Sequence, residues 1–176
     1  KRVHGGAIAV QGPEEKIANE AQTAVAARIA QAVASSIGNE ETVFLGPGEL
    51  TLALAKKLAS HSRLTVVTNG LEIAYWTAAN TSHTVIVTGG QVGGYDLALG
   101  GELARQAFAS MRADKVILEY AGVSAVGGLT EDSLPQAEIA KILMEIGAEI
   151  VVLVPPQRVS RVAVAFVAPV TDADVI

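Results

Sequence analysis

The chain has 176 residues, a length typical of one domain, and half of them are hydrophobic, which excludes intrinsic disorder. It contains no cysteine, so disulfides, zinc ribbons and thiol nucleophiles are excluded. Its 18 acidic and 13 basic residues give a net charge of −5, and this acidic balance argues against nucleic-acid binding by this chain alone.

The longest apolar stretches of the sequence are Ile150–Pro156 and Val162–Val170. Both are shorter than the roughly 18 residues that a membrane-spanning helix needs. The N-terminal residues lack the hydrophobic core of a secretion signal. We therefore expect a soluble protein of the cytoplasm.

The first twelve residues are rich in glycine and show no periodic pattern, so they are predicted to be a linker or arm. A helix is predicted from Pro13 to about Ser36. A proline and two glutamates suit its first turn, and apolar residues then recur at helical spacing. Gly38 follows, where a C-terminal cap is expected.

Short apolar and β-branched runs alternate with helical patterns along the rest of the chain. The predicted strands are 42–45, 64–68, 84–88, 115–118, 150–154 and, more weakly, 163–167. The predicted helices between them are about 49–60, 70–79, 101–111 and 134–146. This alternation predicts right-handed crossovers and an α/β fold with a mainly parallel sheet. Continuously apolar strands indicate helices on both faces of the sheet.

Glycines or small polar residues follow nearly every predicted strand. Ligands of open parallel sheets bind beyond the carboxyl ends of the strands, so the convergence of these loops predicts a pocket there. No single loop carries the prediction, because such loops need glycine for their turns anyway. The loops are Gly46-Pro47-Gly48-Glu49, Thr68-Asn69-Gly70, Gly89-Gly90, Gly122 with Gly127, Gly128 and Thr130, and Pro155-Pro156-Gln157-Arg158.

The loop from Gly46 to Glu49 allows two interpretations. It stands where a phosphate-binding loop would, but it matches neither the Walker pattern nor G-x-G-x-x-G. A carboxylate at a helix start competes with phosphate for the free backbone donors. We therefore favour a turn that Glu49 caps itself.

The remaining polar residues predict no catalytic or metal centre. Glu138 and Lys141 are spaced as a surface ion pair, which we favour over a place at the pocket mouth. The three histidines lack metal-ligand spacing, and no triad or paired-carboxylate motif is present.

Several segments, taken in their order and spacing, resemble the C-terminal effector-sensing domain of the DeoR family of bacterial transcription regulators. The resemblance covers nearly the whole chain. The matching segments are Arg2-Val3-His4-Gly5-Gly6-Ala7, Thr42–Leu45, Thr51–Ala55, Leu64–Leu71, Thr88–Gly90, Arg112–Lys115, Gly128–Thr130, Ala137–Lys141 and Ala168–Asp172.

The resemblance implies a fold related to ribose-5-phosphate isomerase, glucosamine-6-phosphate deaminase and the CoA transferases. It implies a domain over residues 13–176 that binds a sugar-derived effector, usually a sugar phosphate, without a cofactor or metal. Residues 1–12 would be the linker after a winged helix-turn-helix domain that is absent from this chain. Operator DNA would be bound only through that domain. The family also suggests a homo-oligomer.

Departures from the family pattern lie in the loops. The usual Asp-Ser-Gly-Thr-Thr is Gly46-Pro47-Gly48-Glu49-Leu50 here, the usual Asp-Gly is Ala121-Gly122, and the usual Asp-Ser-Ser-Lys ends in Arg158. Arg158 is therefore expected to be the main cation for an anionic effector. The resemblance and the loops together assign these effector-binding residues: Gly46, Gly48, Glu49, Asn69, Gly89, Gly90, Gly122, Thr130, Glu138, Lys141 and Arg158.

An enzyme of the isomerase or deaminase type is the alternative that the resemblance leaves open. Such an enzyme needs a carboxylate base beside a carbonyl substrate. The candidates near the loops are Glu49, Asp96, Glu119 and Glu138. A third interpretation, an acyl-CoA-handling relative of the same fold, would need a glutamate nucleophile and a pantetheine groove, and the sequence identifies neither.

Overall fold

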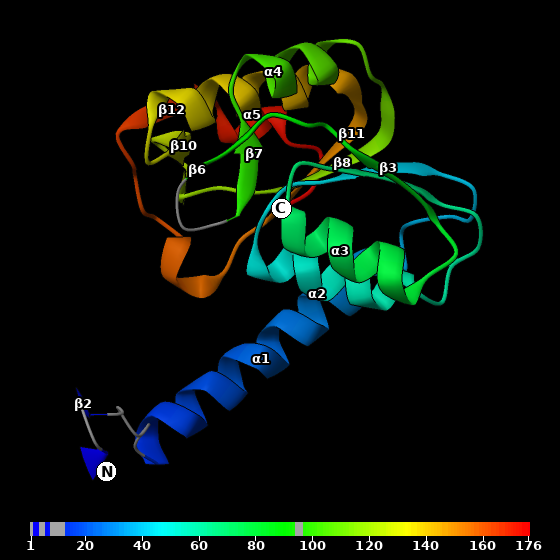
Figure 1. The fold of residues 1–176 in the computed structure, drawn as a ribbon. Coiled ribbons are helices and arrows are strands. Elements are labelled where there is room, and N and C mark those ends of the chain that lie inside the picture. Colours follow the sequence, from blue (N-terminus) through cyan, green and yellow to red (C-terminus); the bar gives the residue numbers. More distant parts are fainter. Residues whose placement is uncertain (1, 4–5, 8–12, 94–96) are drawn as a thin grey trace.

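A parallel sheet of five strands forms the centre of the computed structural model, which describes residues 2–3, 6–7, 13–93 and 97–176 (Figure 1). The strand order is β11-β8-β3-β4-β5, and all four pairings are parallel. The strands are β3 (Thr42–Leu45), β4 (Thr65–Thr68), β5 (Thr84–Val87), β8 (Ala113–Glu119) and β11 (Gly147–Leu153). The predicted α/β class and parallel sheet are confirmed.

Helices cover the sheet on both sides. They are α1 (Pro13–Ala34), α2 (Glu49–Leu58), α3 (Leu71–Asn80), α4 (Glu102–Ala109) and α5 (Leu134–Ile146), within a few residues of the predicted ranges. The alternation of β3 separates the two layers: Val43 and Leu45 belong to the core under α1 and α2, and Phe44 belongs to the core under α4 and α5. Each helix therefore buries its apolar stripe against its own face of the sheet.

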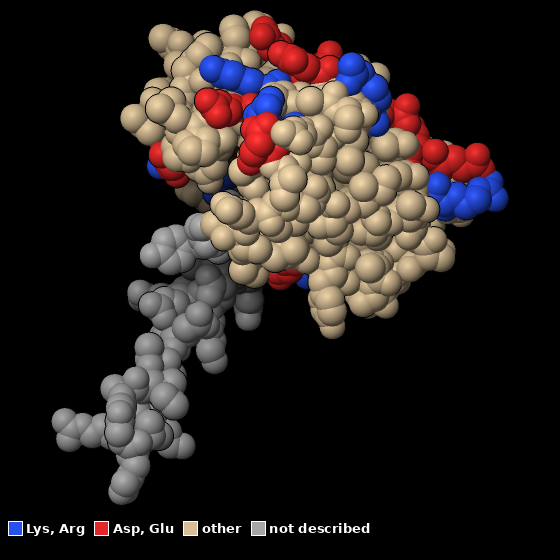
Figure 2. Space-filling model, turned by 45° about the horizontal axis from the view of Figure 1, so that its top comes forward, with Lys and Arg blue, Asp and Glu red and all other residues tan. Residues whose placement is uncertain are grey.

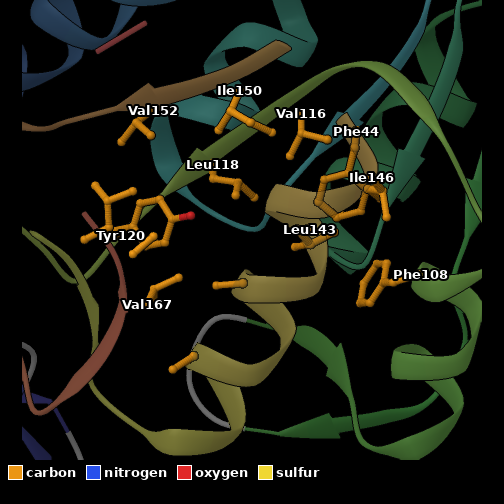
Figure 3. Packing of buried hydrophobic residues seen from close by; sticks show 14 of the residues in the cluster. Phe44, Phe108, Val116, Leu118, Tyr120, Leu143, Ile146, Ile150, Val152 and Val167 are labelled. Carbon is orange, nitrogen blue, oxygen red and sulfur yellow. The ribbon is translucent and has the colours of Figure 1, made fainter. Parts of the chain in front are cut away.

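The core under α4 and α5 contains the buried aromatic side chains of the described residues, Phe44, Phe108 and Tyr120 (Figure 3). Phe44 of β3 and Phe108 of α4 are fully buried and meet edge to face, with ring centroids 5.4 Å apart. Leu143 and Ile146 of α5 belong to the same cluster. The contact between Phe44 and Phe108 joins α4 to β3, the middle strand of the sheet.

A second, antiparallel sheet holds the sixth predicted strand. It has the order β12-β10-β9 and consists of β9 (Gly122–Ser124), β10 (Gly128–Glu131) and β12 (Ala165–Ala168). The predicted strand 163–167 is thus present as β12, but it pairs in antiparallel fashion and lies outside the parallel sheet. No helix separates β9 from β10, and an antiparallel hairpin needs no crossover.

The other short elements escaped prediction. They are the hairpin of β6 (Gln91–Gly93) and β7 (Ala98–Gly100), the pair β1 (Arg2–Val3) and β2 (Gly6–Ala7), and two 3-10 turns, η1 (Pro156–Arg158) and η2 (Val170–Asp172). Most of the predicted linker over residues 1–12 lies outside the described residues. Within the described part of the chain, no helix is both long and apolar enough to cross a membrane.

We predict that Phe108→Ala lowers the free energy of unfolding by about 3–5 kcal/mol, because it leaves a cavity beside Phe44. The matched control is Phe166→Ala on β12, whose side chain is 55% exposed and should cost far less. Urea denaturation of both variants measures the difference. Equal losses would contradict the assignment of Phe108 to the core.

Candidate functional site

The carboxylate of Glu119 caps the N-terminus of α2. Glu119 is the last residue of β8, and β8 lies beside β3, the strand that leads into α2. The backbone amides of Leu50 and Thr51 donate to Glu119 Oε1 at 2.9 and 3.0 Å, and the Thr51 hydroxyl donates to the same oxygen at 3.2 Å. A negative charge at this end of a helix also interacts favourably with the helix dipole.

Gly48 makes this contact possible. A Cβ at Gly48 would collide with the Glu119 carboxylate, so no larger residue fits there while Glu119 is in place. Gly46 continues the edge of β3, and its amide donates to the carbonyl of Ile117 at 2.9 Å. The two glycines therefore shape the loop around an internal carboxylate.

Glu49 does not have the capping role that the sequence suggested. Its side chain is exposed and accepts a hydrogen bond from Gln22 Nε2 of α1 at 3.2 Å. The prediction of an internally capped turn is correct in kind but wrong in the residue. The capping carboxylate comes from a strand 69 residues away along the chain.

The positive charge of Arg158 acts on two partly buried carboxylates, those of Glu119 and Glu131. Burial raises the pKa of Glu119, and the bonds from Thr51 and the charge of Arg158 oppose that shift. Burial also raises the pKa of Glu131, at the end of β10, to about 7, again against the attraction of Arg158. The site thus combines one cation with two acids.

Arg158 and Arg161 fix the segment after β11 against the end of β8. Arg158 Nη1 donates to the carbonyl of Tyr120 and Arg161 Nη1 to that of Ala121, each at 2.8 Å. Arg161 also forms an ion pair with Asp132. Arg158 therefore keeps a defined position in the wall of a cavity between α1, α2 and η1.

A cavity of about 290 Å³ lies between α1, α2 and η1. Its walls carry three charged side chains, Glu49, Glu119 and Arg158, among mostly apolar neighbours. The other lining residues are Ala21, Gln22, Val25, Ala26, Leu50, Pro155, Pro156 and Gln157. The carboxyl ends of β3, β8 and β11 converge here, as expected for a ligand site of a parallel sheet.

Other predicted site residues have internal partners. Asn69 is buried, and its Nδ2 donates to the carbonyl of Leu99 at 3.0 Å. The buried hydroxyl of Thr130 donates to the carbonyl of Gly122 and accepts from the amide of Ala163. These polar groups hold loops together, and none of the three predicted residues lines the cavity.

Four further predicted residues lie away from the cavity. Gly89 and Gly90 have positive φ angles of 72° and 119° in the connection from β5 to β6. Glu138 and Lys141 are exposed on α5, on the opposite face of the sheet from α1 and α2. Their assignment to effector binding stays a prediction. Of the predicted residues, only Glu49 and Arg158 line the cavity, and Gly48 lies against the Glu119 carboxylate.

Among the described residues, the histidines and remaining acids form no second site. His61 and His83 each place Nε2 against backbone carbonyls, of Ala34 and Ile37 for the first and of Leu58 for the second. Asp96 lies outside the described residues. Among the residues that the structure describes, no group of three or more metal-binding side chains occurs.

Comparison with known families identifies the chain's relatives. Residues 21–176 match the family model described as the DeoR C terminal sensor domain. The chain is 30% identical to the transcriptional repressor AccR of Agrobacterium fabrum over the whole chain and 70% of that protein. It is 29% identical to the HTH-type transcriptional regulator GolR of Listeria innocua, over the whole chain and 71% of that protein.

A more distant relative is the glycerol-3-phosphate regulon repressor of Escherichia coli, 27% identical over 88% of the chain and 62% of that protein. Solved structures with the same fold include a ribose-5-phosphate isomerase bound to phospho-erythronic acid, at a TM-score of 0.55 and 13% identity over 78% of this chain and 54% of that one. Another is eIF2B beta from Chaetomium thermophilum, with a TM-score of 0.57 and 18% sequence identity. The match covers 80% of this chain and 40% of that one. At these identities the structures indicate the fold alone, and they confirm the expected isomerase-like architecture.

We predict that Glu119→Ala destabilises the domain by about 1–3 kcal/mol, because it leaves the amides of Leu50 and Thr51 without their acceptor. Glu49→Ala removes a neighbouring but exposed carboxylate and should change stability by less than about 0.5 kcal/mol. Thermal unfolding of the two variants tests this. A larger loss for Glu49→Ala would mean that the wrong carboxylate has been identified as the cap.

We predict that stability falls as the pH rises from 5 to 8. The folded pKa of Glu131, about 7, exceeds its ordinary value of 4.5, so the folded state binds the proton more tightly. Its contribution is complete below the unfolded pKa and is lost as the pH passes the folded pKa, by at most about 3 kcal/mol. Glu131→Gln, which cannot ionise, should reduce this loss. Chemical denaturation at several pH values measures it, and an unchanged slope in the variant would refute the role of Glu131.

Proposed function

Since the chain belongs to the DeoR family of transcription regulators, as its C-terminal sensor domain, we propose that it senses a sugar-derived metabolite in the cavity between α1, α2 and η1. Effector binding would control how a separate helix-turn-helix domain binds operator DNA. The protein would act in the cytoplasm. The observation that carries the proposal is a cavity whose lining combines Arg158 with the carboxylates of Glu49 and Glu119.

The chemistry of the cavity suits a small polyhydroxylated molecule. Carboxylates accept hydrogen bonds from hydroxyls, and a guanidinium donates them, so one side of the ligand would meet acceptors and the other a donor. The volume of about 290 Å³ is at the lower end of the range for small-molecule sites. The name of one relative, the glycerol-3-phosphate regulon repressor, supports an effector of about this size and class.

A phosphate group on the effector would lie near Arg158 and away from α2. Two backbone amides and one hydroxyl of the first turn of α2, from Leu50 and Thr51, already donate to Glu119. A second anion about 4 Å from that carboxylate would be repelled by about 4 kcal/mol at an effective dielectric of about 20. We propose that the effector presents neutral hydroxyls to α2, and an anion, if it has one, to Arg158.

Helix α1 provides the route from the cavity to a DNA-binding domain. Ala21, Gln22, Val25 and Ala26 of α1 form one wall, and Gln22 is hydrogen-bonded to Glu49 at the start of α2. A ligand that fills the cavity would therefore press on α1 or replace its bond to Glu49. In Figure 1, α1 extends away from the sheet toward the N-terminal end, on which the family has its DNA-binding domain.

We propose that the domain is not an enzyme. Glu119, one of the two candidate bases that line the cavity, has its Oε1 occupied by three hydrogen bonds from Leu50 and Thr51, so this oxygen serves to hold α2 in place. The relatives reported above carry the names of regulators and repressors. Turnover of ribose 5-phosphate or glucosamine 6-phosphate above a heat-denatured control would overturn this part of the proposal.

We predict that a thermal-shift screen of free sugars, sugar acids and sugar phosphates finds a stabilising compound, since a ligand at 100 times its Kd adds about 2.7 kcal/mol. Arg158→Ala should then weaken that compound's binding at least about tenfold, in line with loss of a desolvated charged contact. Lys141→Ala removes an exposed cation on α5 and should leave the affinity unchanged.

Calorimetric titration of the two variants gives the comparison. Equal affinities in the wild type and Arg158→Ala would show that the effector binds elsewhere. A stronger effect of Lys141→Ala would instead favour the effector-binding role that the family resemblance implies for that residue.

A further inference from the structure

One edge strand of the five-stranded sheet, β11, is hydrogen-bonded to the C-terminal segment, whereas no further strand in the described part of the chain pairs with the other edge strand, β5. At the β11 edge the amide of Val152 donates to the carbonyl of Val175 at 2.9 Å, and the amide of Val175 donates to the carbonyl of Ile150 at 3.2 Å. The amide of Ile150 donates to the Asp174 carboxylate at 2.7 Å. The C-terminal residues thus close this edge. At the other edge, no strand of the described residues lies beyond β5.

The backbone of β5 offers free groups outward. The amide of Thr84 donates to Leu64 at 3.0 Å and that of Thr88 to Thr68 at 3.3 Å, so the amides of alternate residues face β4. The peptide groups of Val85 and Val87, between them, face away from the sheet. An exposed row of this kind is a template for another strand, and proteins usually protect it with lysine, proline or a bulge. β5 reads Thr-Val-Ile-Val and has none of these.

The surface around β5 is apolar and almost without charge. Ile86 and Val87 are 37% and 43% exposed, and Tyr75 of α3 is 77% exposed. From residue 64 to residue 100, Glu72 is the one charged side chain among those that the structure describes. Figure 2 shows a broad face of the molecule that carries none of the acidic and basic side chains. Such a face in a net-acidic chain is typical of an interaction surface.

We propose that β5 pairs in antiparallel fashion with β5 of a second copy of this chain, across a twofold axis. The register that uses both outward peptide groups sets Val85 opposite Val87 of the partner and forms four backbone hydrogen bonds, with Ile86 at the axis. The two five-stranded sheets then become one continuous sheet of ten strands.

A second copy fits this edge better than another partner. A strand paired with itself is complementary in length and side chain without further adaptation, and the near absence of charge means that identical faces do not repel each other. A partner of different sequence would be expected to be selected by complementary charge, and this face offers almost none. Helix-turn-helix proteins also bind two half-sites through a twofold dimer, so such a dimer suits a regulator, although the β5 argument does not depend on it.

Sedimentation equilibrium of the 176-residue chain at micromolar concentration tests the proposal. The expected mass is twice the 18.1 kDa of one chain. Ile86→Lys sets two like charges opposite each other at the axis, and Val87→Pro removes an outward amide without adding charge; both should give the mass of one chain. The control is Val126→Lys, a fully exposed valine between β9 and β10, which should remain a dimer.

Hydrogen exchange separates loss of pairing from loss of folding. In the wild type the amides of Val85 and Val87 should be protected; in Ile86→Lys they should exchange rapidly while that of Thr84, bonded within the sheet, stays protected. A monomeric wild type would overturn the proposal. So would a dimer that survives both substitutions with folding intact, or one in which the Val85 and Val87 amides exchange freely.

Discussion

The carboxylate of Glu119 on the first turn of α2 organises the functional end of this domain. Burying a carboxylate is costly unless donors replace its hydration. Here two amides, one hydroxyl, the positive end of α2 and the nearby guanidinium of Arg158 do so together. The same contact ties the end of β8 to the start of α2 and leaves no space for a side chain at Gly48. The shape and the charge of the cavity therefore follow from one interaction.

The internal carboxylate also changes what this edge of the fold can bind. The amides at the start of a helix that follows a strand are a natural anion site, because they are unpaired and point outward. In this chain the amides of Leu50 and Thr51 already donate to Glu119 before any ligand arrives. A ligand beside α2 meets the acceptor oxygens of Glu119 and Glu49 instead of amide donors, and Arg158 is left as the cation of the cavity. The same fold can thus prefer hydroxyls at a position suited to phosphate.

Much of the fold was predictable because its signals are local. Short β-branched runs such as Thr42–Leu45 and the capped apolar pattern of 134–146 identify buried strands and a helix without knowledge of their neighbours. The hairpin of β6 and β7 has three-residue strands rich in glycine, too short for a periodic pattern. The segment 163–167 has a strand-like composition, but composition does not specify which sheet a strand joins.

The candidate site was less predictable because its key contact joins residues far apart. The sequence marks a polar residue at a strand end but not where its side chain points. Asn69 and Thr130 turn inward to backbone carbonyls, whereas Glu119, considered only as a possible base, reaches the neighbouring helix. Arg158 lines the cavity at the end of the sheet, where the position of the segment after β11 suggested a cation, and its role toward an effector stays a prediction. Gly48 was the one local sign that Glu119 contacts this loop, because the Glu119 carboxylate lies too close to Gly48 to allow a Cβ there.

The proposed sensing cavity and the proposed β5 interface lie at different places on the sheet. The cavity lies at the ends of β3 and β8, and β5 is two strands beyond β3, or about 10 Å at the usual spacing. A dimer built through β5 would make the sheet a shared rigid frame, because its strands would be hydrogen-bonded across the axis. Helix α1 instead contacts the cavity through small side chains and one hydrogen bond, between Gln22 and Glu49. An effector in the cavity would therefore displace α1 of each copy relative to a fixed sheet, and the two displacements would be related by the same twofold axis.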